Sequence, residues 1–229
     1  MKVKPLKRTP LSQRKLPDYT RGEEITNMVT HIVGGALGIL ALVLCPIAGV
    51  RHHSAWAVVS GVIYGTCMLT LYAISSVYHG LSPRLFGKRV MQVLDHCSIF
   101  ALIAGTYTPI ALCKIRAEDP ALGWTIFGVI WALAAVGITL NAIDLKKYDR
   151  FSQTCYLLMG WCIVFKISMV RRLIGEAGFW LLLSGGLAYT VGAALYAIGR
   201  KRRYAHSAFH VFVVIGSLLH FLCILLYVL

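Results

Sequence analysis

The apolar residues of this chain fall into long blocks that are separated by short polar stretches. A helix needs roughly 20 apolar residues to cross the hydrocarbon core of a bilayer, which is about 30 Å thick. The blocks predict seven membrane-spanning helices, at residues 27–50, 54–80, 91–113, 121–143, 152–170, 178–199 and 206–228. The alternating ten-residue segments of an outer-membrane barrel are absent. The pattern therefore predicts an all-α, polytopic membrane protein.

Composition agrees with this prediction. Hydrophobic residues make up 58% of the chain and charged residues 14%, whereas a soluble protein has roughly 25% charged residues. The seven cysteines lie almost wholly inside the apolar blocks and form no C-x-x-C pair. We therefore expect neither a disulfide framework nor a thiolate zinc site.

Glycine and proline inside the segments indicate close packing and bending. Gly34-Gly35, Gly61-x-x-x-Gly65 and Gly185-Gly186 predict positions where helix backbones approach each other closely. The run Gly105-Thr106-Tyr107-Thr108-Pro109 is expected to kink the third segment, because proline removes a backbone hydrogen bond. This kink either lines a cavity or serves packing.

Basic residues are unequally divided between the two sides of the predicted membrane protein. Residues 1–26 and the loops after the second, fourth and sixth segments hold 17 lysines and arginines, and the opposite side holds six. Cytoplasmic loops are enriched in Lys and Arg, so we expect a cytoplasmic N-terminus, an outside C-terminus and a location in the cell membrane. The same rule accounts for the net charge of +14 and for the basic run Arg200–Arg203. We therefore expect no nucleic acid as a partner.

Residues 1–26 are polar and basic and contain three prolines. They predict a mobile cytoplasmic tail that has no core of its own. Glu23 and Glu24, near the end of this stretch, lie just before the first predicted helix, where acidic residues suit the positive end of the helix dipole. A role near the site described next is the alternative.

Ionisable or polar side chains lie where several apolar segments begin or end. Ser75 and His79 occupy the last turns of the second segment, Asp95 lies about one turn into the third, and His206 and His210 lie in the first turns of the seventh. In the predicted topology all five fall at nearly one membrane depth, at the cytoplasmic face. Polar groups inside a membrane are costly unless they are paired, so we interpret the five as one site.

The histidines of this group predict a metal ion. His206 and His210 are four residues apart and therefore share a helix face. Three imidazoles that leave a fourth position for water are a known arrangement of catalytic zinc, so we expect His79, His206 and His210 to bind Zn²⁺. Asp95 is expected to ligate the ion directly or to hold its water, and Ser75 to donate to that water or to a substrate oxygen.

Each residue of the group also has a purely structural interpretation. An H-x-x-x-H pair at a helix start is weak evidence of metal binding, Asp95 can cap a helix or pair with a basic loop residue, and Ser75 can bond to its own helix. His31, two turns into the first segment, is interpreted as a packed or solvated histidine, with the cavity of the site as the alternative. The shared membrane depth favours the metal site.

The motifs that surround these residues carry a family resemblance. They are Glu23-Glu24-Ile25 with Thr30-His31, Ser75-x-x-x-His79-Gly80, Leu94-Asp95-His96-Cys97, Ala104-Gly105-Thr106-Tyr107-Thr108-Pro109, Met159-Gly160-Trp161 and His206-Ser207-Ala208-Phe209-His210. In these motifs, over nearly its whole length, the chain resembles the hemolysin III family, the bacterial branch related to adiponectin and progestin-type receptors. The resemblance implies seven membrane helices and a zinc ion held by His79, His206 and His210, with Asp95 and Ser75 alongside.

The resemblance and the residues leave three functions open. The leading hypothesis is a zinc-dependent hydrolase of a lipid amide or ester near the cytoplasmic leaflet, as is proposed for related families that act on ceramides, with Asp95 as general base and Ser75 at the oxyanion. The second is a sensor or regulator of membrane state with a structural zinc, and the third is a cytolytic pore. Membrane lipids are the expected partners. The short tail and outside loops form no evident hormone-binding domain.

Overall fold

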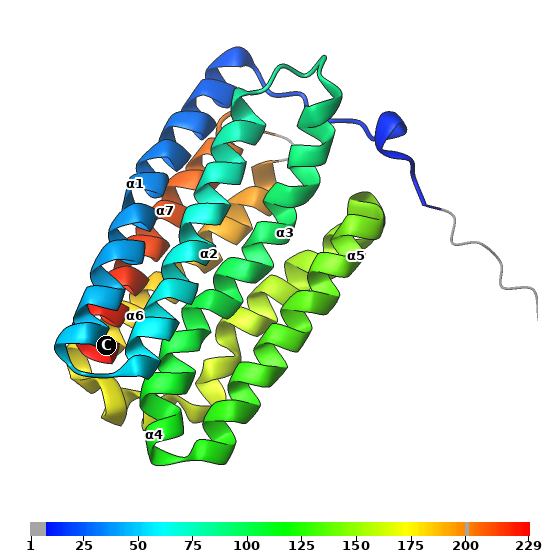
Figure 1. Cartoon of the computed structure of the whole chain (residues 1–229). Helices are drawn as coiled ribbons and strands as arrows, with labels where there is room; N and C mark the ends of the chain where they lie inside the picture. Colours follow the sequence, from blue (N-terminus) through cyan, green and yellow to red (C-terminus); the bar gives the residue numbers. More distant parts are fainter. Residues whose placement is uncertain (1–7, 200–201) are drawn as a thin grey trace, which may run out of the picture.

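Helices form all the regular secondary structure of the computed structural model, which describes residues 8–199 and 202–229. The elements, in chain order, are η1 (Leu11–Gln13), α1 (Arg21–Arg51), α2 (Ala55–Gly80), α3 (Phe86–Pro109), η2 (Ile110–Ile115), α4 (Arg116–Glu118), α5 (Pro120–Trp161), η3 (Cys162–Lys166), α6 (Ile167–Gly199), α7 (Ala205–Cys223) and η4 (Ile224–Val228). The long helices lie side by side in one bundle (Figure 1). The predicted all-α fold class is confirmed for this part of the chain.

Five helical stretches of the described residues are long and apolar enough to cross a membrane. They are Arg21–Arg51, Ala55–Gly80, Phe86–Glu118, Pro120–Ala197 and Ala205–Val228. Large apolar side chains such as Val33, Leu158 and Phe165 are exposed on the surface of the bundle. An apolar surface of this kind is unfavourable in water and suits contact with lipid tails. The helices thus have the character of membrane spans.

The longest stretch, Pro120–Ala197, contains two of the predicted segments and all but the last two residues of a third, and it turns back on itself within α5. Ser152 donates a 2.6 Å hydrogen bond to Asn141, although eleven residues of straight helix would separate them by about 16 Å. The chain turns between them at Asp144, whose φ of −157° and ψ of 94° are not helical. Figure 1 shows α5 running up the bundle and then returning.

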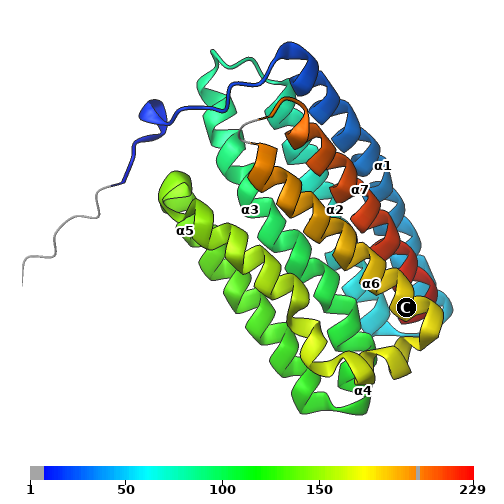
Figure 2. The ribbon, with the colours of Figure 1, turned by 180° about the vertical axis from the view of Figure 1, so that it is seen from behind.

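A second reversal separates α5 from most of α6. Trp161, at the end of α5, donates a 2.9 Å hydrogen bond to Thr190 in α6. Between them lies Gly175, whose φ of 71° falls in the left-handed region that glycine adopts readily. Beyond this turn α6 runs alongside α7 (Figure 2). Both reversals fall in the predicted gaps between apolar segments, at residues 144–151 and 171–177.

α1 and α2 pack closely because glycine leaves room for the neighbouring backbone. A Cβ atom at Gly61 would lie 2.9 Å from the carbonyl carbon of Cys45, and a Cβ atom at Gly65 would overlap Leu42. Neither position accepts a side chain without a shift of the helices. The predicted close contact at Gly61-x-x-x-Gly65 is confirmed.

α1 begins at Arg21, six residues before the predicted membrane segment 27–50. Thr20 accepts a 3.3 Å hydrogen bond from the Glu23 backbone N–H, and the Glu23 carboxylate accepts a 2.8 Å bond from the Thr20 N–H. This capping box satisfies backbone donors at the helix start. Glu23 therefore stabilises the start of α1, as expected. It lies in the first turn of the helix and not before the helix.

Residues 8–20, which belong to the predicted mobile tail, contact the bundle. The Arg14 side chain is 7% exposed and donates a 3.0 Å hydrogen bond to the carbonyl oxygen of Ile143. The Thr9 N–H donates a 2.8 Å bond to Asp144. Residues 1–7 of the predicted tail, and Arg200 and Lys201 of the basic run, lie outside the described residues.

The predicted kink of the third segment is a change of helix type. α3 ends at Pro109 and continues as the π-helix η2. Because proline cannot donate a backbone hydrogen bond, the ladder is reorganised at this position. Thr106 and Tyr107, which precede Pro109, line the cavity described below.

Candidate metal centre

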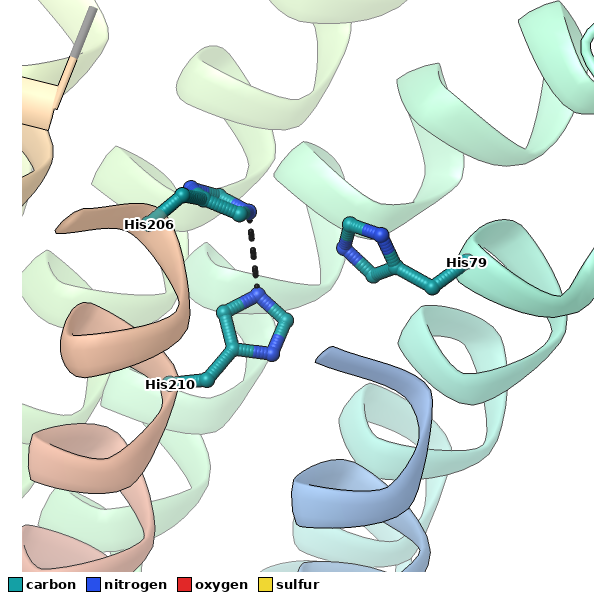
Figure 3. A group of neighbouring side chains, drawn as sticks. All are labelled: His79, His206 and His210. Atoms are coloured by element: carbon teal, nitrogen blue, oxygen red, sulfur yellow. Dashed lines mark hydrogen bonds between the residues drawn. The ribbon is translucent and has the colours of Figure 1, made fainter. Parts of the chain in front are cut away.

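At one end of the bundle, α2 ends and α1, α3 and α7 begin (Figure 1), and three histidines of α2 and α7 lie in these turns. His79 lies in the last turn of α2, and His206 and His210 lie in the first turns of α7. All three are buried, and one ring nitrogen of each lies within 4.8 Å of the others. Figure 3 shows the three rings facing one another. The structure thus brings together the three residues that the sequence predicted as metal ligands.

Contacts with α1 fix the ring of His79. Its Nδ1 lies 2.6 Å from Oε2 of Glu24, and an ionised carboxylate only accepts hydrogen bonds, so Nδ1 carries the hydrogen. The second nitrogen, Nε2, is buried and has no hydrogen-bond partner among the described residues. A metal-binding histidine has this arrangement, with one nitrogen held by a carboxylate and the other free to ligate.

Glu24 is itself held by a buried cation. Lys88, at the start of α3, is 1% exposed and donates a 2.6 Å hydrogen bond to Oε1 of Glu24. It donates a second bond, of 2.9 Å, to the carbonyl oxygen of Leu81. A buried charge needs such partners, so the pair is expected to keep the carboxylate in place beside His79.

α1 also orients His210, through Asn27. Nδ1 of His210 lies 3.3 Å from the backbone carbonyl oxygen of Asn27, which can only accept, so Nδ1 donates. The Asn27 side chain is fully buried and accepts a 2.7 Å bond from Ser207. As with His79, the remaining Nε2 of His210 is turned toward the cluster.

The two histidines of α7 are close to the spacing of metal ligands. Nε2 of His206 lies 3.0 Å from Nε2 of His210. Because Nδ1 of His210 carries its hydrogen, His206 donates in this contact. In a tetrahedral zinc site with Zn–N distances of about 2.0–2.1 Å, ligand nitrogens are about 3.3–3.4 Å apart, so a small shift suffices. Three imidazoles, one of which has an unpartnered buried nitrogen in Nε2 of His79, fit a zinc ion.

Asp95 and Ser75 lie beside the cluster, not in it. Both line a cavity of about 390 Å³ that is also lined by His31, His206 and His210. Oγ of Ser75 is buried without a hydrogen-bond partner among the described residues. The Asp95 carboxylate lies 3.8 Å from Nδ1 of His96. Neither residue belongs to the described group of metal-competent side chains.

His31 lines this cavity, which was the alternative interpretation of its position. Its ring is 3% exposed and stacks on His210 with centroids 3.7 Å apart. Both of its ring nitrogens are buried without a hydrogen-bond partner in the described part of the chain. His31 therefore offers a polar edge next to one of the three candidate ligands.

Sequence reasoning held a role of Glu24 and His31 near the site only as an alternative, and it did not single out Asn27. Glu24, Asn27 and His31 follow one another at i, i+3 and i+7 and so lie on one helix face. A polar stripe of this kind on an apolar helix is a detectable signal. Tyr19, whose ring stacks on His206 with centroids 4.9 Å apart, lies in the predicted tail and carried no such signal.

Comparison with known proteins places the chain in a family. A family model described as "Haemolysin-III related" matches residues 19–221. The chain belongs to this family. As a member of the haemolysin-III-related family, it is a membrane protein, and the matched region contains every residue of the candidate centre.

Individual relatives of this haemolysin-III-related chain are similar over most of its length. Hemolysin-3 of Bacillus cereus is 39% identical over 208 residues, which cover 90% of this chain and 92% of that protein. The hemolysin-3 homolog of Bacillus subtilis is 37% identical, with 91% and 96% covered. The human monocyte to macrophage differentiation factor is 25% identical, with 95% and 88% covered.

Proposed function

We propose that this chain is a zinc-dependent hydrolase of a lipid amide or ester. The observation that carries the proposal is a cluster of three buried histidines, two of which, His206 and His210, line a cavity that Asp95 and Ser75 also line. A binding site with mostly apolar walls and a few convergent polar groups is typical of small-molecule sites. The polar groups here are of the types that hydrolysis needs.

We further propose seven membrane spans, a cytoplasmic N-terminus and an outside C-terminus. The excess of Lys and Arg on one side of the predicted topology supports this orientation, and the two reversals of Pro120–Ala197 support the number of spans. The candidate centre would then lie near the cytoplasmic leaflet. A reporter enzyme that is active only outside the cytoplasm is expected to work when fused after Leu229 and to fail when fused before Met1.

His79, His206 and His210 are proposed to hold the zinc ion. When bound, zinc polarises a carbonyl oxygen and makes a water molecule more acidic. The hydrogen bonds from His79 to Glu24 and from His210 to Asn27 orient both rings before binding. This chain therefore supplies a preformed nitrogen set.

Asp95 and Ser75 are proposed to act on the substrate. The Asp95 carboxylate accepts a proton from the attacking water and returns it to the leaving amine or alcohol. The Ser75 hydroxyl, whose oxygen has no partner among the described residues, donates to the carbonyl oxygen as negative charge develops there. The C–N bond of the amide, or the C–O bond of the ester, breaks, and a fatty acid is released.

The cavity walls favour a lipid substrate. Side chains such as Leu71, Ile99 and Leu102 line it, and they suit an acyl chain better than a charged metabolite. The location of the cavity inside a bundle of apolar helices agrees with a substrate that comes from the bilayer. Membrane lipids are the proposed partners.

The test is fatty-acid release by purified, zinc-loaded protein from a panel of ceramide-type amides and glycerolipid esters, measured by mass spectrometry. Asp95→Asn is expected to keep its zinc and to lose about 10²- to 10⁴-fold in rate. Ser75→Ala is expected to lose less, and His96→Ala, which also changes a cavity residue, should retain zinc. Folded, zinc-loaded protein that releases no fatty acid from any lipid of the panel would contradict the proposal.

A second candidate function is favoured by the contacts of α1. Glu24 and Asn27 link α1 to His79 and His210, so that a zinc ion would tie α1, α2 and α7 together. In this alternative the ion is structural and the protein senses or regulates the membrane without turnover. A fully protein-ligated ion, with a cell phenotype unchanged by Asp95→Asn, would favour it.

A further inference from the structure

The cavity that adjoins the histidine cluster extends along α7 to another polar residue, His220. His206, His210 and His220 all line it. Ten residues separate His210 from His220, which is about 15 Å along the helix axis. Between these two ends the lining includes apolar side chains such as Ile103 and Val213. The cavity therefore has a polar end at the cluster and a second polar position deep in the bundle.

The hydrogen bonding of His220 defines what it can bind. The ring is buried, and Nε2 lies 3.0 Å from the carbonyl oxygen of Leu182 in α6. Since a carbonyl only accepts, Nε2 carries the hydrogen, and Nδ1 of the neutral ring is an acceptor. Nδ1 is buried and has no hydrogen-bond partner in the described part of the chain. It is an acceptor without a donor.

Two polar side chains that line the same cavity, those of Tyr189 and Thr190, are bonded to other groups. The hydroxyl of Tyr189, whose ring contacts His220, lies 2.6 Å from Oγ of Ser217. The Thr190 hydroxyl donates to the carbonyl oxygen of Gly186 at 2.8 Å and accepts from Trp161. A donor for His220 is therefore expected to come from a molecule in the cavity.

α6 is shaped to hold the His220 ring in this position. A Cβ atom at Gly185 would overlap the ring, so a larger residue would push it out of place. The absence of a side chain at Gly185 lets the ring reach the carbonyl of Leu182 and fixes the tautomer that leaves Nδ1 as acceptor. Ring position and hydrogen bonding thus support each other.

We propose that Nδ1 of His220 is a second binding position of this cavity, which accepts a hydrogen bond from a hydroxyl group on the distal half of an acyl chain. This inference rests on the proposed lipid substrate, whose carbonyl would lie at the histidine cluster. An unpaired buried acceptor is unfavourable, so a chain that carries a donor at the right depth binds better than one that does not. The protein then selects hydroxylated acyl chains.

The test uses three free fatty acids of one chain length, one unsubstituted, one hydroxylated in its distal half, and one with a methyl ether at the same carbon. The ether has similar polarity but cannot donate. Dissociation constants are measured by native mass spectrometry on the full-length, zinc-loaded protein in detergent. One hydrogen bond predicts about 3- to 10-fold tighter binding of the hydroxylated acid than of the ether.

Variants at two positions assign this preference. His220→Leu should abolish it, His220→Gln should keep part of it because an amide oxygen accepts, and Gly185→Ala should weaken it by displacing the ring. Melting temperature and gel filtration establish that each variant is folded.

Equal binding of all three acids by the unmodified protein would mean that Nδ1 binds only water. A preference for the hydroxylated acid that persists in His220→Leu would assign this preference to another group. Either result overturns the inference. Free acids need no cleavage, so failure of the hydrolase proposal is measured separately.

Discussion

Nδ1 of His79 lies 2.6 Å from Oε2 of Glu24, and this contact joins the first helix to a candidate metal ligand of the second. The same carboxylate accepts a hydrogen bond from Lys88 of α3. One acid thereby connects three helices at the end of the bundle where the histidines converge. A carboxylate behind a histidine fixes its tautomer and ring orientation, so the free Nε2 of His79 depends on Glu24.

Glu24→Gln is expected to weaken zinc binding by about 10- to 100-fold. The amide keeps the size of the side chain but removes the charge that holds Nδ1 of His79 and neutralises Lys88. Zinc affinity is measured by competition with a chelating dye. Because a buried lysine left without its partner can itself destabilise the fold by about 3–5 kcal/mol, the melting temperature is recorded alongside.

Glu23→Gln is the matched control for this variant. Glu23 is the adjacent acid, but it accepts hydrogen bonds from the backbone N–H groups of Thr20 and Tyr204. The control is expected to cost about 1 kcal/mol of stability as a weakened helix cap and to leave zinc affinity unchanged. Equal loss of zinc affinity in both variants would show that Glu24 has no specific part in the site.

Removal of zinc is expected to lower the melting temperature, because an ion that binds only the folded state stabilises it by mass action. Chelation should lower the melting temperature of the unmodified protein and have little effect on His79→Ala, which lacks one of the three nitrogens. His96→Ala, a histidine outside the cluster, should respond to chelation as the unmodified protein does. The measurement is a thermal melt in detergent with and without chelator, and an unchanged melt of the unmodified protein would argue against a bound ion.

The helical class and the three-histidine cluster were accessible from sequence for physical reasons. Length and hydropathy alone limit an apolar block in a membrane to a helix, and the four-residue spacing of His206 and His210 places both on one face. His79 joined them because the count of apolar segments put the end of the second beside the start of the seventh. The helical class thus rests on a strong local signal, and the cluster rests on a weak local pair together with the count of segments.

Contacts between distant segments were not accessible in the same way. The capping box of Thr20 and Glu23 extends α1 beyond its apolar block, so the helix begins before the segment that hydropathy predicts. Arg14 is buried through backbone carbonyl oxygens such as that of Ile143, and carbonyl groups carry no sequence pattern. The unpaired nitrogen of His220 depends on how its ring meets Leu182, which spacing along α7 does not specify.

Gly65→Ala is expected to destabilise the bundle by about 1–3 kcal/mol, as overpacking does. A Cβ atom there would overlap Leu42 in α1, so the two helices would have to separate. Gly128→Ala is the control, since a Cβ at Gly128 would have no described atom within 4 Å and alanine favours the helix by up to about 1 kcal/mol. Unfolding titrations in mixed detergent measure both, and equal stability of the two variants would contradict the close packing.

Tyr19 covers the cluster from the N-terminal side, and its removal is expected to speed the loss of zinc. Its ring stacks on His206 with centroids 4.9 Å apart and an angle of 19° between the planes. Burial raises the pKa of the Tyr19 hydroxyl, so the ring meets His206 as a neutral group. Tyr19→Ala should open a path for water and chelator, and stopped-flow chelation should show a several-fold faster release.

Two variants separate this covering role from a general effect of losing a tyrosine. Tyr19→Phe keeps the ring and should release zinc at the rate of the unmodified protein, because the stacking needs no hydroxyl. Tyr148→Ala removes a half-buried tyrosine near the turn of α5 and should also leave the rate unchanged. If Tyr19→Ala releases zinc no faster than these two, access to the histidines does not pass beneath Tyr19, and the ion must exchange through the cavity that Asp95 lines.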